Sequence, residues 1–186
     1  MQNALVLLAD GFEDIEAITV IDVLRRGGVA VTTASIHDRL EVKSAHNVMM
    51  KADALYTDVA DAEPYGVIVL PGGGEGTENL KAFSPLKSLL LRQREEGRLI
   101  AAICAAPTAL VAADVIEKGV HMTCYPTCQM ELDRPWGNAS VVEDRGLITG
   151  QAPGSAMLFS LVILKALVGE TIALKIARGM VTDVLQ

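Results

Sequence analysis

The chain has 186 residues, of which 51% are hydrophobic and 21% are charged, with a net charge of −7 and only 4% aromatic residues. This composition excludes a disordered chain and supports a sizeable core, so we expect a single domain over residues 1–186. The acidic balance argues against nucleic acid or an anionic membrane as the main partner. The scarcity of aromatic residues argues against base stacking.

The N-terminal segment predicts neither a secretion signal nor a membrane anchor. Its apolar run stops at Asp10 and no basic residue precedes it, whereas a spanning helix needs about 20 apolar residues. We therefore expect a cytoplasmic protein without a membrane partner.

The cysteines Cys104, Cys124 and Cys128 are odd in number and do not indicate a disulfide framework. Cys124 and Cys128 lie four residues apart with His121 nearby, which leaves a metal site as an alternative. Because this spacing is loose and no second ligand pair follows, we favour structural roles and predict no metal and no cofactor.

Strand and helix patterns alternate in chain order. Short apolar or β-branched runs, typical of buried strands, occur at 4–9, 29–35, 65–70 and 99–103. Apolar residues at helical spacing predict helices at 14–26 and 85–96, and residues 40–50 resemble a hairpin or an edge segment.

The second half continues with a short helix from Pro107 to about Ala113 and a further candidate strand at Val120–Cys124. The predicted hairpin at 140–149 turns at EDRG, and two helices follow at about 155–167 and 171–184. This alternation predicts a mostly parallel sheet between helical layers, which is a three-layer α/β/α sandwich.

Three predicted strands end in unusual residues: Asp10–Glu16, Pro71–Gly74 and Cys104–Pro107. In such a sheet, ligands bind outside the carboxyl ends of strands near a topological switch point. If the strands are neighbours, the three loops converge.

Cys104 follows a buried strand and precedes two alanines and a proline, as a side chain on a nucleophile elbow would. A helix N-terminus there would favour the thiolate and lower the cysteine pKa. The alternative is a small buried hydrophobe that ends the strand.

The glycine run Gly72–Gly74 allows backbone to approach a ligand, and its amides with that of Ala105 would form an oxyanion hole. A tight turn is the alternative, and no phosphate-loop pattern is present. Glu16 is either a partner of the sulfur or an exposed acid that stabilises the start of a helix. None of the three histidines directly follows the cysteine, so no triad is evident: His37, His46 and His121.

The segment AAICAAPTAL at Ala101–Leu110 resembles the cysteine elbow of the ThiJ/PfpI superfamily, in particular its DJ-1 and YajL-like branch. Four further segments resemble the family and occur in family order over nearly the whole chain: Ala9–Gly28, Val67–Leu80, Met122–Thr127 and Leu147–Phe159. The resemblance implies a flavodoxin-like α/β sandwich that forms a homodimer, with Ile15 and Val48–Met49 at the contact.

The resemblance also implies the site residues. Cys104 takes the place of the family's oxidisable nucleophile, Glu16 that of its protonated partner glutamate, and Gly73 and Ala105 those of its backbone donors. The site lining falls on four further residues: Gly72, Tyr125, Pro153 and Gly154.

Three positions depart from the family's patterns. Ala105 stands where PfpI-type members carry a histidine, which argues against a protease. Tyr125 stands where DJ-1 proteins carry a nearby histidine, and His46 replaces an arginine of the edge segment, which weakens the case for an anion pocket between subunits.

The resemblance leaves two main classes of function. One is a cysteine-dependent enzyme on small reactive carbonyls, either a glyoxalase that turns methylglyoxal into lactate or a deglycase of glycated substrates, with a role against oxidative stress. The other is a redox-sensing stress protein or chaperone that acts through oxidation of Cys104. We favour the enzyme; a binding domain without chemistry is a third alternative.

Overall fold

A computed structural model describes residues 3–61 and 64–182. Within this part of the chain the main sheet has the strand order β5-β2-β1-β6-β7-β9-β8, and all neighbours are parallel except β8 and β9. Its strands are β1 (Asn3–Leu8), β2 (Ala30–Ser35), β5 (Ala54–Leu55), β6 (Val67–Leu70), β7 (Leu99–Ile103), β8 (Val141–Asp144) and β9 (Leu147–Gly150).

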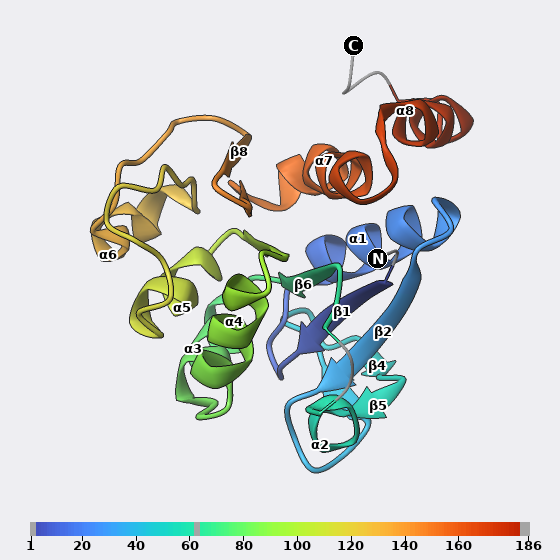
Figure 1. Cartoon of the computed structure of the whole chain (residues 1–186). Helices are drawn as coiled ribbons and strands as arrows, with labels where there is room; N and C mark the ends of the chain where they lie inside the picture. Colours follow the sequence, from blue (N-terminus) through green and yellow to red (C-terminus); the bar gives the residue numbers. More distant parts are fainter. Residues whose placement is uncertain (1–2, 62–63, 183–186) are drawn as a thin grey trace.

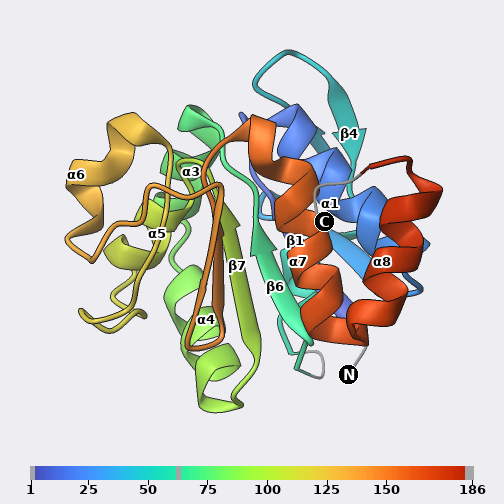
Figure 2. The ribbon, with the colours of Figure 1, turned by 90° about the horizontal axis from the view of Figure 1, so that it is seen from above.

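Helices cover both faces of this sheet (Figures 1 and 2). One face carries α1 (Asp14–Arg26) and α7 (Ala156–Val168), with α8 (Glu170–Gly179) packed on α7. On the other side lie α2 (Tyr56–Val59), α3 (Gly74–Ala82), α4 (Leu86–Glu95), α5 (Pro107–Ala112) and α6 (Gln129–Leu132). The predicted three-layer α/β/α sandwich is therefore confirmed.

The apolar run of β1 is continuous because each face of the strand is buried under a helical layer. Val6 and Leu8 join the apolar cluster beneath α1 and α7, whereas Leu5 and Leu7 join the cluster on the other face. Successive strand residues point to opposite faces, so a strand covered on both sides needs apolar residues throughout.

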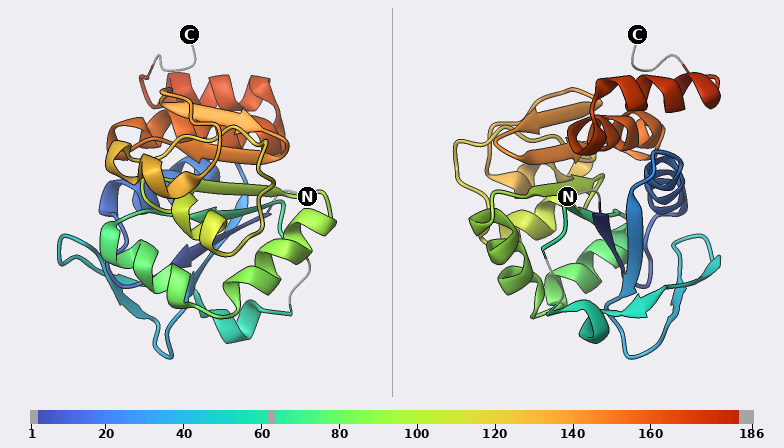
Figure 3. Two further views of the ribbon diagram at one scale, coloured as in Figure 1. Left: turned by 90° about the vertical axis from the view of Figure 1, so that its left-hand side faces the viewer. Right: turned by 45° about the vertical axis from the view of Figure 1, so that its right-hand side comes forward.

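A second sheet of two antiparallel strands, β3 (Glu41–Lys43) and β4 (Met49–Lys51), shows that the region predicted as a hairpin or an edge segment is a hairpin. It projects beside α1 at the edge of the molecule (Figures 2 and 3). Backbone hydrogen bonds from Gly11 to the Lys43 carbonyl and from Ala45 to the Phe12 carbonyl join this hairpin to the loop after β1.

Several elements differ from the sequence predictions. The helices α2, α3 and α6 were not predicted. Val120–Cys124 is not a strand of the sheet, because β7 pairs with β9 and only an isolated bridge joins Met122 to Trp136.

The last predicted helix is shorter than expected. It ends at Gly179, where the Met180 amide bonds back to Ile176 and Ala177 and Val181 takes a left-handed φ of 54°. Positions 183–184 of that prediction lie outside the described residues. Among the described residues, no helix has the length and apolar character needed to cross a membrane.

The sheet has its switch point between β1 and β6. From β1 the chain continues to β2 on one side, whereas β6 is followed by β7 and β9 on the other. The carboxyl ends of β1, β6 and β7 are therefore adjacent, which is where α/β sheets bind ligands.

Candidate active site

Cys104 occupies a sharp turn directly after β7. Its φ of 64° is left-handed, a strained conformation for a residue with a side chain, and such strain is typical of a nucleophile elbow. Two backbone bonds hold the turn: the Cys104 amide donates to the Gly150 carbonyl (2.9 Å), and the Tyr125 amide donates to the Cys104 carbonyl (2.8 Å). Cys104 keeps 8% of its surface exposed.

Glu16 lies in the first turn of α1 and is 1% exposed. Its Oε2 accepts the Gly72 amide at 2.7 Å. Its Oε1 is buried with no partner of regular hydrogen-bond geometry among the described residues. The Cys104 thiol lies close enough to this carboxyl for each group to change the pKa of the other.

Gly72 makes this pairing possible because it has no side chain. A Cβ there would stand 2.7 Å from the Cβ of Cys104 and 2.7 Å from Oε2 of Glu16. The next residue, Gly73, has a φ of +91°, and a Cβ there would stand 2.1 Å from the Gly11 carbonyl. The three loops therefore converge as predicted.

The N-cap of α1 adds Glu13, which is not among the predicted site residues. Glu13 is 7% exposed, and its carboxylate accepts the Glu16 amide at 2.8 Å. The signal was available, because an acidic residue three positions before Glu16 suits an N-cap. The Glu13 amide also donates to the Gly72 carbonyl (3.0 Å), so this cap fixes Glu16 against the glycine loop.

Burial raises the pKa of Glu16 to about 7, helped by the charge of Glu13 and opposed by the hydrogen bonds from Gly72 and Cys104. Burial also raises the pKa of the Cys104 thiol, as do the charge and hydrogen bond of Glu16. The amides of Gly73 and Ala105 lower the pKa of this thiol, but by less than burial and Glu16 raise it. The expected low cysteine pKa is therefore wrong, since the helix after the elbow has only six residues and the sulfur is desolvated.

The amides of Gly73 and Ala105 lower the pKa of the Cys104 thiol, which indicates that both lie near the sulfur. Tyr125 is joined to the elbow through its backbone, while 42% of the residue is exposed. Pro153 and Gly154 lie in the turn after β9, and no hydrogen bond within the described chain joins them to Cys104 or Glu16. The roles predicted for these residues stay predictions.

The histidines lie away from the sulfur–carboxyl pair. His37 accepts the Asp10 amide (2.9 Å), His46 bonds to Asp14 through Nδ1 (2.7 Å), and the exposed His121 lies beside Asp144 on β8. One group of metal-ligand atoms in the described chain, from Glu13, Asp14 and His46, lies within 4.8 Å of one another. These side chains already bond to protein groups, so the prediction of no metal stays a prediction.

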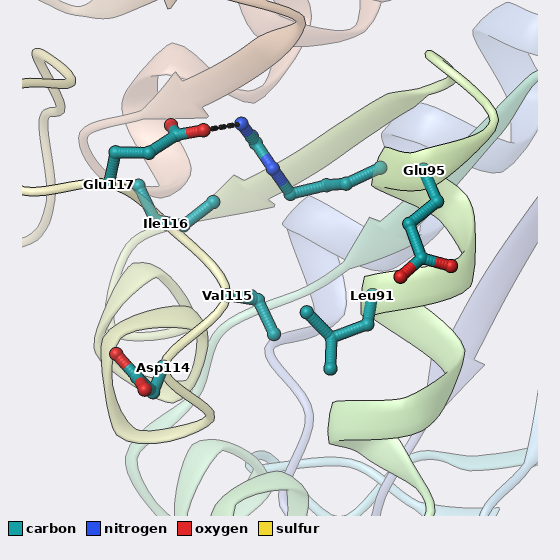
Figure 4. Close-up of a pocket in the computed structure, with 7 residues that line it drawn as sticks. Leu91, Glu95, Asp114, Val115, Ile116 and Glu117 are labelled. Atoms are coloured by element: carbon teal, nitrogen blue, oxygen red, sulfur yellow. Dashed lines mark hydrogen bonds and ion pairs between the residues drawn. The ribbon is translucent and has the colours of Figure 1, made fainter.

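A separate surface hollow of about 480 Å³ lies between α4 and the segment 114–117 (Figure 4). Leu91 and Val115 line it, and the Arg94–Glu117 pair (2.6 Å) lies along it. None of the predicted site residues lines this hollow. We assign the chemistry to the elbow because that is where a strained thiol and a buried carboxyl meet.

Comparison with known proteins agrees with this geometry. Residues 2–166 match the sequence model of the DJ-1/PfpI family. The chain belongs to the DJ-1/PfpI family. It is 39% identical over 182 residues to Protein DJ-1alpha of Drosophila melanogaster, covering 96% of this chain and 83% of that protein.

Two further matches place the chain in the DJ-1 branch of this family. The crystal structure of Drosophila melanogaster DJ-1beta superposes with a TM-score of 0.93 at 37% identity and covers 98% of each chain. A Caenorhabditis elegans relative, 34% identical over 173 residues and 90% of each chain, is named glutathione-independent glyoxalase DJR-1.2. The fold and the family are thus shown, and the activity is a matter for proposal.

Proposed function

We propose that this DJ-1/PfpI protein is a cofactor-independent enzyme on small reactive carbonyls, of the glyoxalase type, with Cys104 as nucleophile and Glu16 as proton carrier. The observation that carries the proposal is an elbow thiol beside a buried carboxyl whose pKa is raised to about 7. A relative named as a glyoxalase supports the same chemistry.

In the first step the Cys104 sulfur bonds to the aldehyde carbon of a 2-oxoaldehyde. The thiol proton passes through Glu16 to the carbonyl oxygen, which gives a hemithioacetal. The amides of Gly73 and Ala105, which favour negative charge on the sulfur in the resting site, stabilise the negative charge that develops on that oxygen.

In the second step Glu16 takes the proton from the carbon bonded to sulfur and returns it to the neighbouring carbon, while the hydroxyl proton on the first carbon moves to the oxygen of the second. The first carbon is oxidised and the second reduced, so the product is a thioester of a 2-hydroxy acid and no external electron carrier is needed. Water then hydrolyses the thioester, which releases lactate when the substrate is methylglyoxal and restores the thiol.

A carboxyl with a pKa of about 7 suits this role, because near neutral pH it is ionised often enough to take a proton and protonated often enough to give one. The raised pKa of Cys104 means that the sulfur needs Glu16 as its base. With no histidine at the sulfur, we expect modest turnover.

The test is methylglyoxal consumption together with lactate formation by the purified protein. Cys104→Ser should lower kcat/KM roughly a thousandfold, and Glu16→Asp should lower it by shortening the reach of the carboxyl. Cys128→Ser, which changes a thiol outside the site, serves as the matched control. Wild-type protein that leaves methylglyoxal unchanged, or a fully active Cys104→Ser, would reject the enzyme.

A redox-sensing stress protein is the second candidate, favoured by the same carboxyl and the two amides that face the sulfur. These groups would stabilise a sulfinate on Cys104 by charge-assisted hydrogen bonds. Mild peroxide should add two oxygen atoms to Cys104 and none to Cys124 or Cys128. Oxygen spread evenly over the three cysteines would count against this function.

We also infer that a second copy of the chain covers an apolar face on α1 and the adjoining hairpin. Ile15, Ile18, Val48 and Met49 are each at least 50% exposed there, and apolar patches of this kind mark interaction sites. Ile15→Lys with Met49→Lys should give a monomer by sedimentation, whereas Met130→Lys, at an exposed apolar residue elsewhere, should leave the dimer intact. A wild-type monomer at working concentration would contradict the inference.

A further inference from the structure

Two cysteines outside the active site meet at one carbonyl oxygen. The Cys124 thiol donates to the Tyr125 carbonyl at 3.3 Å. The Cys128 amide donates to the same oxygen at 2.8 Å and closes the 3₁₀ turn Pro126–Cys128. The sulfur of Cys124 therefore lies over the turn that Cys128 ends.

The environment keeps both side chains on the same side of the sheet. Cys124 is fully buried in the apolar cluster beside Leu132, and Cys128 packs against that cluster while part of it remains exposed. One thiol of the pair is thus protected and the other is accessible to a small reagent.

We propose that Cys124 and Cys128 form a reversible intrachain disulfide, a second redox site that takes low-molecular-weight disulfides as its oxidant. A disulfide requires Cβ atoms about 3.5–4.5 Å apart. Cys124 is buried and Cys128, four residues later, is partly exposed. Neither residue belongs to a strand of the sheet, so closing the bond changes the conformation of the segment 124–128.

The exchange has two balanced steps. The Cys128 thiolate attacks the small disulfide, forming a mixed disulfide and releasing one thiolate. The Cys124 thiolate then attacks the Cys128 sulfur, forming the intrachain bond and releasing the second. The two cysteines lose two electrons, the small disulfide gains them, and the two cysteine protons end on the released thiols.

Burial makes this exchange slow at neutral pH and faster at alkaline pH. It raises the pKa of Cys124 to about 12, with further contributions from Cys128 and Glu131, and it also raises the pKa of Cys128. The charged groups around Cys128 are Glu131 of α6 and Glu78 and Lys81 of α3. The two acids raise the pKa of Cys128. Lys81 and a hydrogen bond from Thr127 lower it. The thiolate fraction, and with it the rate, should rise about tenfold per pH unit below the pKa.

The disulfide would act on the active site through one hydrogen bond. Its loop encloses Tyr125, whose amide holds the Cys104 carbonyl at 2.8 Å. Closing the loop restrains the segment that supports the elbow, so the reactivity of Cys104 toward an alkylating reagent should differ between the two redox states.

The test incubates the folded protein with oxidised glutathione at pH 7 and pH 8.5, alkylates free thiols after denaturation and maps tryptic peptides. Trypsin does not cut before Pro135, so the peptide 119–145 carries Cys124 and Cys128, while Cys104 lies in a separate peptide, 99–118. We expect 119–145 to become two hydrogens lighter and to escape alkylation, faster at pH 8.5 than at pH 7.

Variants separate the proposed route from other thiol chemistry. Cys104→Ser should form the disulfide like wild type, and Cys124→Ser should stop at a mixed disulfide on Cys128. Three results would overturn the proposal: full alkylation of 119–145 in the treated wild type, glutathione retained on Cys128 in the wild type, or an equilibrium constant for the bond no higher in the folded protein than in denaturant. None of these readouts depends on glyoxalase activity, so the proposed function can fail independently.

Discussion

The first turn of α1 carries two carboxyl groups, two residues apart, that are in opposite electrostatic states. Glu16 points into the interior beside Cys104, and burial raises its pKa to about 7. Asp14 lies at the rim; although partial burial opposes the change, hydrogen bonds from Ser44 and His46 lower its pKa. Both groups share the same helix terminus, so the difference comes from tertiary neighbours and solvent rather than from the helix dipole.

This contrast explains why an acid-rich helix start supplies one proton carrier and not three. Asp14 stays charged across the physiological range because its partners are polar. Glu13 uses its carboxylate to cap the Glu16 amide. Glu16 alone combines a solvent-excluded position with a neighbouring thiol, and each of the following substitutions tests one element of that contrast.

The largest effect is expected for Glu16→Gln. Removal of the proton carrier should lower kcat/KM roughly a thousandfold. In the wild type the pKa rises from the ordinary 4.5 to about 7 on folding, so the folded state holds a proton that the unfolded state releases. Stability is therefore lost as pH rises from about 4.5 to 7, by about 3 kcal/mol.

Urea unfolding at pH 4 and pH 8 checks the sign of this effect. Glu16→Gln should match the wild type at pH 4 and be more stable at pH 8, because the amide keeps an acceptor for Gly72 without the buried charge. A Glu16→Gln variant that is less stable than the wild type at pH 8 would show that burial does not destabilise the ionised carboxylate of Glu16. Catalysis should follow ionisation, with wild-type kcat/KM rising as pH increases through about 7.

The second effect concerns the space between the two site residues. Gly72→Ala would place a methyl group 2.7 Å from both the Cys104 Cβ and Glu16 Oε2. We expect a loss of about 1–3 kcal/mol from overpacking and a loss of activity of at least tenfold. Gly74→Ala is the matched control, since its Cβ meets nothing within 4 Å; if both variants behave alike, the close approach at Gly72 is not what positions the pair.

The smallest effect is expected at the rim. Asp14 raises the pKa of the exposed His46 above its ordinary 6.5 through their hydrogen bond, so the stabilisation is present at low pH and lost as pH rises through the His46 pKa. His46→Gln should be slightly less stable than the wild type at pH 6, equal to it at pH 9, and unchanged in activity. A large change in kcat/KM in this variant would mean that the Asp14–His46 pair takes part in catalysis.

Much of the fold was predictable from local patterns. The apolar runs of β1, β6 and β7 could only be buried on both faces, and Gly27 marked the end of the helix after β1. The helix α3 escaped prediction because its sequence, GEGTENLKA, begins with glycines that are usual in loops. Val120–Cys124 has the composition of a strand, yet β9 occupies the place beside β7.

The residues of the candidate site were predictable from the sequence, but the directions in which their pKa values shift were not. An elbow cysteine, a glycine run and an acid at three strand ends were visible in the sequence. The direction of the Cys104 pKa was not, because it depends on how far solvent is excluded and on which oxygen of Glu16 faces the sulfur. The burial of Glu13 depends on the same packing, although its position as an N-cap was visible in the sequence.

The sequence by itself determined the α/β alternation, the family and the residue types that meet at the strand ends, because periodicity and turn chemistry are local properties. Only the tertiary structure decided that Gly72 leaves room for the sulfur and the carboxyl to face each other, that Glu16 rather than Asp14 titrates near neutrality, and that Cys124 and Cys128 share one carbonyl. The first two outcomes depend on desolvation and on distances between segments far apart in the chain, and the third depends on how the segment 124–128 packs against the core, none of which a local sequence pattern encodes.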